Sequence, residues 1–529
     1  MVASRTATAA TDPGRALSPS ERWFWIVDRI SPSNCCGRIR LHGRIDPASL
    51  ERAAAALVAE YPLLRLGISA PGDRDPRLTP LTAPRIPLRR LESGDPDQWL
   101  RELDAEMSAR FAVGTGLARL VDVVGGAGTA EETHDIIVTI SHIIADGRSL
   151  MAVLRKLITY AATTGPVPGG SAADPVGKNA DSARLTAVGR ADEAEVGRLV
   201  GSAPGRAAVP PADDLIPAAS RGFWRYAYTT LYDQAAALVL RPRRLSGAVP
   251  VPLPDRRTRI VHRSVTVEES RALLDDCRRA GVTVHGALAA AVARSIGAAA
   301  YSAASPEPRV RRWGGRGWRR ADGGVGTRGA GHADEVAGAR GVGGRRGVTG
   351  KRGVAGIGSP VDFRALLEPA PEADELGIYA PVLTGFVPFG AGVSLWEAAR
   401  AINRQVRRGV RQRRHLATVA GMRFGTPRTV ASGWRIAEMV DRRAPWNVSV
   451  TNLGRVEFPE KAGEWRLSGL VLAAGNSCVS AMTVAVVTAH GELHIGFCYV
   501  DRILPETAAA AFADDVLMAL LDRPAPSGQ

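Results

Sequence analysis

The sequence predicts an α/β protein built of two halves, and three observations support this prediction. The β-branched stretch 134–140 is typical of a buried strand, and apolar residues recur at helical spacing from 150 to 158. A second strand-and-helix pair is predicted at 38–43 and 47–58. The Gly- and Pro-rich stretch 163–170 then interrupts the pattern, which indicates a linker between two halves.

The N-terminal half is predicted to span residues 18–165. The seventeen residues before it are rich in Ala and Thr and lack the apolar core of a secretory signal, so we expect a flexible tail. Asp46 and Pro47 suit the N-cap and the first position of the helix that follows strand 38–43. The stretch 61–65 is expected to end that helix and to begin a new strand.

Residues 141–147 read Ser-His-Ile-Ile-Ala-Asp-Gly and join the first of these predicted strands to its helix. His142 therefore lies on a strand-to-helix loop, a place where a rigid scaffold often carries functional groups. Asp146 can serve the site or simply cap the helix. Gly147 can leave room for a substrate or be an ordinary loop glycine. The residue types alone leave these alternatives open.

The C-terminal half is predicted to span residues 186–522, after a linker at 166–185. Its predicted elements are strand 260–267, a helix that ends before Gly281, a helix at 284–296, a helix that opens with a capping box at Ser394 and Glu397, and a hairpin at 480–500 that turns at 490–492. Residues 223–244 combine aromatic and basic side chains in a helical pattern. We expect this helix to pack on the body, with a membrane surface as the alternative.

The basic charge is concentrated in one stretch, residues 306–357. The chain carries a net charge of +15, and residues 309–352 contain 12 Lys or Arg against 3 Asp or Glu. This Arg/Gly-rich composition cannot bury enough apolar surface to fold, so we expect disorder or an out-of-frame segment of the gene. No nucleic acid is expected as a partner, because the remaining sequence contains no nucleic-acid-binding motif.

Composition limits the remaining function classes. Apolar residues make up 45% of the chain, which supports a globular core, and no apolar run is long enough to span a membrane. Five cysteines without a Cys-x-x-Cys pair predict neither disulfides nor a zinc site, so we expect a cytoplasmic protein without a metal. His490 and His494 lie on the predicted hairpin and not on a helix, which disfavours a shared metal. Walker and dinucleotide motifs do not appear in a suitable context.

The segment Ser-His-x-x-x-Asp-Gly resembles the His-His-x-x-x-Asp-Gly signature of the superfamily of condensation domains and chloramphenicol acetyltransferase. The family's catalytic histidine corresponds to His142, and its first histidine is replaced by Ser141. Asp146 and Gly147 match the other two fixed positions. The resemblance implies that Asp146 is structural and pairs with an arginine across the site.

Later segments match in the expected order. Arg364, in Ser-Pro-Val-Asp-Phe-Arg, corresponds to the family's partner arginine, although a surface ion pair is the alternative. The stretch 447–454 resembles the strand and Asn-x-Gly turn that close the family's channel, which implies that Asn452 and Gly454 line it together with Ser141. The resemblance covers most of residues 18–522 and is greatest to polyketide-associated acyltransferases of the phthiocerol/phthiodiolone dimycocerosyl transferase type.

This resemblance implies a fold of two chloramphenicol-acetyltransferase-like halves, each a mixed sheet with flanking helices, and an active-site channel between them. It implies an acyltransferase of polyketide, lipid or other secondary metabolism, in which His142 is the general base. The acyl donor would be a thioester on coenzyme A or on the phosphopantetheine of an acyl carrier protein, and no bound cofactor is expected. The acceptor would be a small alcohol or amine.

Two other functions stay open. One is amide formation, as in the condensation enzymes of nonribosomal peptide synthesis. The other is a catalytically inactive scaffold that keeps the fold. Expected partners are an acyl carrier protein or a polyketide synthase. We expect a monomer, and peripheral contact with a membrane is left as an alternative.

Overall fold

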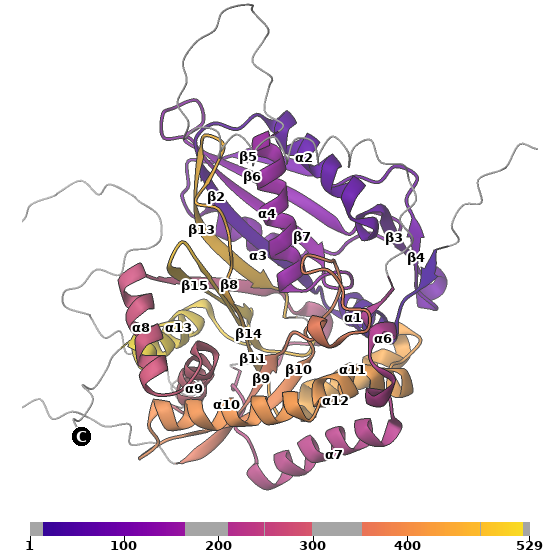
Figure 1. Cartoon of the computed structure of the whole chain (residues 1–529), viewed down its shortest axis with the longest axis vertical. Helices are drawn as coiled ribbons and strands as arrows, with labels where there is room; N and C mark the ends of the chain where they lie inside the picture. The colour runs from indigo at the N-terminus through magenta and orange to yellow at the C-terminus, as the bar shows by residue number, and fades with distance from the viewer. Residues whose placement is uncertain (1–13, 164–209, 248, 299–351, 477, 522–529) are drawn as a thin grey trace, which may run out of the picture.

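The computed structural model describes residues 14–163, 210–247, 249–298, 352–476 and 478–521. Two six-stranded sheets with helices on their faces make up the molecule (Figure 1). Both sheets are mixed, because β5 pairs with β6 in parallel and β11 pairs in parallel with β9 and β14, while the other pairs are antiparallel. This arrangement confirms the predicted fold class.

The N-terminal sheet has the order β12-β13-β2-β7-β6-β5. Its strands from the first half are β2 (Asn34–His42), β5 (Leu88–Glu92), β6 (Ala118–Gly125) and β7 (Thr133–Ser141). Its helices are α2 (Pro47–Glu60), α4 (Gly147–Thr163) and α3 (Gln98–Ser108). Alternation along β7 sends Ile136 and Val138 into the core under α2 and α4, and Ile137 into the core with α3. Each face of the sheet is therefore buried.

The C-terminal sheet has the order β10-β9-β11-β14-β15-β8. Its strands are β8 (Thr258–Val265), β9 (Gly353–Pro360), β10 (Val382–Phe389), β11 (Val448–Arg455), β14 (Met482–Ala489) and β15 (Glu492–Val500). Its helices are α8 (Val267–Arg279), α9 (Val284–Gly297), α10 (Leu395–Arg411) and α13 (Glu506–Leu521). The predicted capping box of Ser394 with Glu397 starts α10, and Gly281 has the positive φ of a C-terminal stop after α8.

Further helices surround the two sheets. They are α1 (Pro19–Ile30), α6 (Ala212–Leu215), α7 (Phe223–Leu240), α11 (Arg414–Gly425) and α12 (Val430–Arg443). Helix α7 lies along the outside of α11, at the edge of the molecule (Figure 1). None of the helices in the described ranges is long and apolar enough to cross a bilayer.

One hairpin crosses between the halves. Strands β12 (Lys461–Ala462) and β13 (Trp465–Ala474) follow β11 in the chain but join the N-terminal sheet, where β13 pairs antiparallel with β2. The predicted C-terminal half, 186–522, is therefore not one spatial unit. Strand β13 is buried on both faces of that sheet, because Leu472 and Val471 enter the cores on its opposite sides.

Two predicted boundaries in the first half are wrong. Residues 14–17 of the expected flexible tail are ordered, because β1 (Arg15–Ala16) pairs with β4 (Arg77–Pro80) in a small sheet with β3 (Leu66–Ser69). The stretch 61–65 forms a 3₁₀ turn and not the start of a strand. Pro62 occupies the first position of this turn, where a missing N–H is tolerated, and the new strand β3 begins only after it, at Leu66.

The predicted C-terminal boundary of the Arg/Gly-rich stretch is also wrong. Residues 353–357, which were included in the low-complexity segment, form most of β9 and pair with β10. Ala355 and Ile357 are fully buried. A Cβ on Gly356 would collide with the carbonyl oxygen of Pro445, so this glycine serves a close backbone approach. Residues 306–351 and the predicted linker 166–185 lie outside the described residues.

Candidate active site

His142 is the first residue after β7. Its main-chain N–H donates to the carbonyl of Ser33 at 3.3 Å, and its half-buried imidazole stacks on Phe24 of α1 with 4.3 Å between the ring centroids. Burial lowers the pKa of His142, and the nearby charge of Asp146 offsets only part of this effect. The imidazole is therefore neutral at neutral pH and can accept a proton.

Asp146 both caps α4 and crosses to the second half of the chain. One carboxylate oxygen accepts from the N–H of Ser149 at 3.0 Å and from Arg364 at 2.9 Å, and the other accepts from the N–H of Tyr379 at 3.0 Å. The two functions that the sequence left as alternatives thus occur together. Asp146 is 3% exposed and Arg364 5%, so their ion pair is buried.

The guanidinium of Arg364 is fixed from several sides. It also donates to the hydroxyl of Ser149 at 2.8 Å and lies 4.2 Å from the centre of the Tyr379 ring. The main-chain N–H of Arg364 donates to the carboxylate of Asp362 at 2.9 Å. These contacts orient Arg364 toward the start of α4, and they place it in the interior and not in a surface ion pair.

We name residues 361–380, which run from β9 to β10 across α4, the crossing segment. Besides the Asp146–Arg364 pair, Arg148 binds Asp362 at 2.5 Å and Lys156 binds Asp374 at 2.6 Å. The helix that follows the His142 loop is therefore held along its length by the second half of the chain.

Gly147 and the end of β11 are neighbours. A Cβ on Gly147 would lie 3.5 Å from side-chain carbons of Leu453 and Leu472, which is ordinary van der Waals contact. Leu453 stands between Asn452 and Gly454, so the turn at the end of β11 lies beside the first residue of α4. The side-chain oxygen of Asn452 accepts from the N–H of Gly454 at 2.8 Å and so holds the turn, in which Gly454 has a φ of 71°.

Ser141 is the last residue of β7 in this structure. It is 1% exposed, pairs with Asn34 of β2, and its hydroxyl accepts from the N–H of Ile143 at 3.4 Å. Its side chain thus stabilises the loop that carries His142.

The sequence reasoning missed several residues of the site, namely Phe24, Ser149, Asp362, Lys156, Asp374 and Tyr379. Two of them carried a signal: Ser149 stands three residues after Asp146, and Asp362 two before Arg364. The contact of Phe24 with His142 joins α1 to a loop more than a hundred residues later, and no local pattern could have indicated it.

The histidines of the terminal hairpin lie apart from this site. His490, in the turn, hydrogen-bonds the carbonyl of Pro459 at 2.9 Å, while His494 is buried and stacks on His262. Among the described residues, no cluster of three or more His, Cys, Asp or Glu side chains has an arrangement that could hold a metal ion.

Solved structures with this architecture include condensation domains, an epimerization domain and an acetyltransferase. The chain is similar to the trichothecene 15-O-acetyltransferase of Fusarium sporotrichioides, with a TM-score of 0.61 and 13% identity over 96% of this chain and 95% of that one. It is similar to the first condensation domain of the calcium-dependent antibiotic synthetase, with a TM-score of 0.59 and 14% identity over 97% and 96%. The chain has the condensation-domain fold.

Other comparisons add a polyketide-associated structure and one sequence relative. Polyketide synthase associated protein 5 from Mycobacterium tuberculosis matches with a TM-score of 0.55 and 14% identity over 98% of this chain and all of that one. One component of the linear gramicidin synthase of Brevibacillus parabrevis is 28% identical over 170 residues, which are 30% of this chain and 2% of that protein. No family model matches the chain.

Proposed function

We propose that this chain is an acyltransferase in which His142 is the general base. The observation that carries the proposal is the half-buried imidazole of His142, stacked on Phe24, on a loop that both halves of the chain hold in place. The imidazole takes the proton of an acceptor hydroxyl or amine while the acceptor attacks the thioester carbonyl. The C–S bond then breaks, and the imidazolium returns the proton to the leaving thiolate.

Positioning residues support this step without touching the reacting atoms. Asp146 is occupied by Arg364, Ser149 and Tyr379, so it fixes the loop and does not act as a hydrogen-bonded partner that orients His142. Phe24 holds the ring by stacking. Much of the rate acceleration would then come from holding donor and acceptor together.

For the substrates, we propose an acyl thioester of coenzyme A or of an acyl carrier protein as donor and a hydroxyl compound as acceptor, in polyketide or lipid biosynthesis. The motif resemblance supports this choice, as does the similarity of the fold to a polyketide synthase associated protein and to an O-acetyltransferase.

Amide formation is the second candidate, and one observation favours it. The sequence relative is a component of a gramicidin synthase, whose name indicates peptide assembly. An amine acceptor would use the same base, so the two reactions differ in the acceptor and not in the role of His142.

A transfer assay tests the proposal. The purified chain would be supplied with a panel of acyl-coenzyme A and acyl-carrier-protein donors and with alcohols or amines, and thiol release and product mass would be followed. We expect His142→Ala to lower turnover by at least about 100-fold, the lower range for a general base. His490→Ala, in the turn between β14 and β15, is the matched control and should leave turnover unchanged, because this imidazole hydrogen-bonds the carbonyl of Pro459 and not the loop of His142.

Three results would contradict parts of this proposal. Turnover of His142→Ala within about tenfold of the original chain would remove His142 from the base role. Products formed only with amines would replace ester formation by amide formation. A folded chain that transfers no acyl group from any donor would favour the scaffold alternative.

A further inference from the structure

Helix α7 turns an apolar face to solvent. Trp224, Leu231, Leu238 and Val239 are 81%, 68%, 76% and 81% exposed, and their spacing places them with Tyr228 on one side of the helix. We name these five residues the α7 stripe. Apolar residues at this spacing normally face a core, so an exposed row of them indicates a binding surface.

The opposite side of α7 attaches the helix to the body. Thr229 is buried, Asp233 pairs with Arg414 of α11, and the ring of Tyr226 lies against Gly421 of α11. Helix α7 is therefore anchored by its polar side. Its apolar stripe is exposed, and the helix lies at the edge of the molecule (Figure 1).

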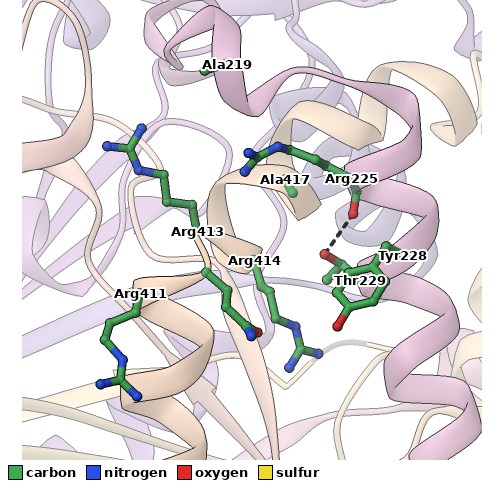
Figure 2. Close-up of a pocket in the computed structure, with 9 residues that line it drawn as sticks. Ala219, Arg225, Tyr228, Thr229, Arg411, Arg413, Arg414 and Ala417 are labelled. Carbon is green, nitrogen blue, oxygen red and sulfur yellow. Dashed lines mark hydrogen bonds between the residues drawn. The ribbon is translucent and has the colours of Figure 1, made fainter.

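A pocket rich in arginines borders this stripe. It has a volume of about 510 Å³, and Arg225 of α7 faces Arg411, Arg413 and Arg414 from the junction of α10 and α11 (Figure 2). Among the described residues that line the pocket none is acidic. Asp233 neutralises Arg414, whereas the other three arginines are exposed. Tyr228 belongs to both the pocket and the stripe, so the two features form one continuous surface.

We propose that the α7 stripe and the arginine pocket together bind the surface of an anionic phospholipid bilayer. A helix that lies in the plane of a membrane immerses its apolar side at the boundary of headgroups and acyl chains, and Trp and Tyr favour that boundary. The planar guanidinium groups beside the stripe would bind lipid phosphates, because each can donate two parallel hydrogen bonds to two oxygens of one phosphate. The α7 stripe carries no charged side chain, which is what insertion to this depth requires.

Two other occupants fit the surface less well. A second copy of the chain packed on the stripe by two-fold symmetry would bring its own arginine pocket close to this one, and like charges would repel. An acidic carrier protein would account for the arginines but not for a row of strongly exposed apolar side chains, because transient protein interfaces are no more apolar than ordinary surface.

Vesicle sedimentation tests the proposal independently of acyl transfer. The full chain would be mixed with vesicles of phosphatidylcholine alone or of phosphatidylcholine and phosphatidylglycerol in equal parts. We expect binding to the anionic vesicles that weakens as salt is added. Leu231→Glu should lower the partition coefficient at least about tenfold, and Arg225→Ala and Arg411→Ala about fivefold each.

Matched control variants distinguish binding through this surface from the effect of the same substitutions elsewhere on the protein. Leu274→Glu changes an exposed leucine on α8, and Arg404→Ala removes an exposed arginine of α10 that does not line the pocket, so both should bind as the original chain does. Three results would overturn the proposal. They are no binding to either vesicle, equal binding by Leu231→Glu and Leu274→Glu, and capture of a carrier protein or self-association through Leu231 in place of vesicle binding.

Discussion

At the residue scale, the imidazole of His142 owes its lowered pKa to burial beside Phe24. A free histidine titrates at about 6.5, so the neutral form of His142 persists to a lower pH. Activity with a non-titrating alcohol acceptor should therefore hold its plateau down to below about pH 6.5 and fall only where the imidazole becomes protonated. The measurement is kcat/KM against pH, which reports the free enzyme.

The same profile for Phe24→Ala provides the control. Removing the ring admits water to the imidazole, which should move the acidic limb of the profile upward toward the value of free histidine. An acidic limb of the original chain at or above about 6.5 would contradict the role given to burial.

A second prediction at this scale concerns the contribution of the Asp146–Arg364 pair to the free energy of unfolding. Each partner is buried, so removing one leaves an uncompensated charge, at a cost of about 3–5 kcal/mol. Asp146→Ala and Arg364→Ala should each lower the free energy of unfolding by this amount, and the double variant should lose clearly less than the sum. Denaturant unfolding of the three variants measures the coupling.

The neighbouring pair of Arg148 and Asp362 is the comparison. The side chain of Arg148 is 58% exposed, so Arg148→Ala should cost under about 1 kcal/mol. Additive losses in the Asp146 and Arg364 cycle would mean that the two charges are stabilised separately.

At the scale of elements, the accuracy of sequence-based prediction depended on whether the signal is local. Helices α2 and α10 begin where Asp46 and Ser394 predict, because a cap and its first turn are contiguous in sequence. The loop of His142 was predicted for the same reason. The crossing segment reaches α4 over more than two hundred residues, and only the resemblance indicated its contact through Arg364.

Strand β9 shows why amino-acid composition gave the wrong end for the predicted low-complexity stretch. Its glycines resemble those of the low-complexity stretch before it, yet Gly356 is required by the backbone of Pro445. Gly356→Ala should therefore destabilise the protein by about 1–3 kcal/mol through overpacking. Gly94→Ala, where an added Cβ meets nothing within 4 Å, should be nearly neutral. Thermal unfolding compares the two, and equal melting temperatures would show that β9 can shift.

At the scale of the whole molecule, the exchanged hairpin makes the two halves one folding unit. Strand β13 comes from the C-terminal part of the chain and pairs with β2 of the first half, so the N-terminal sheet is not complete without both parts of the sequence. The sequence could not indicate this exchange, because the apolar pattern of β13 predicts a strand but not the sheet that it joins.

Cooperative unfolding is the consequence that can be measured. Leu470 of β13 is fully buried in the core of the N-terminal sheet, so Leu470→Ala should cost about 2–5 kcal/mol. Because β13 continues from β11 of the other sheet, we expect calorimetry of the full chain to show a single transition that this substitution lowers as a whole. Leu274→Ala, at a partly exposed position on α8, should lower it much less. Two transitions, only one of them moved by Leu470→Ala, would mean that the sheets unfold separately despite the shared strand.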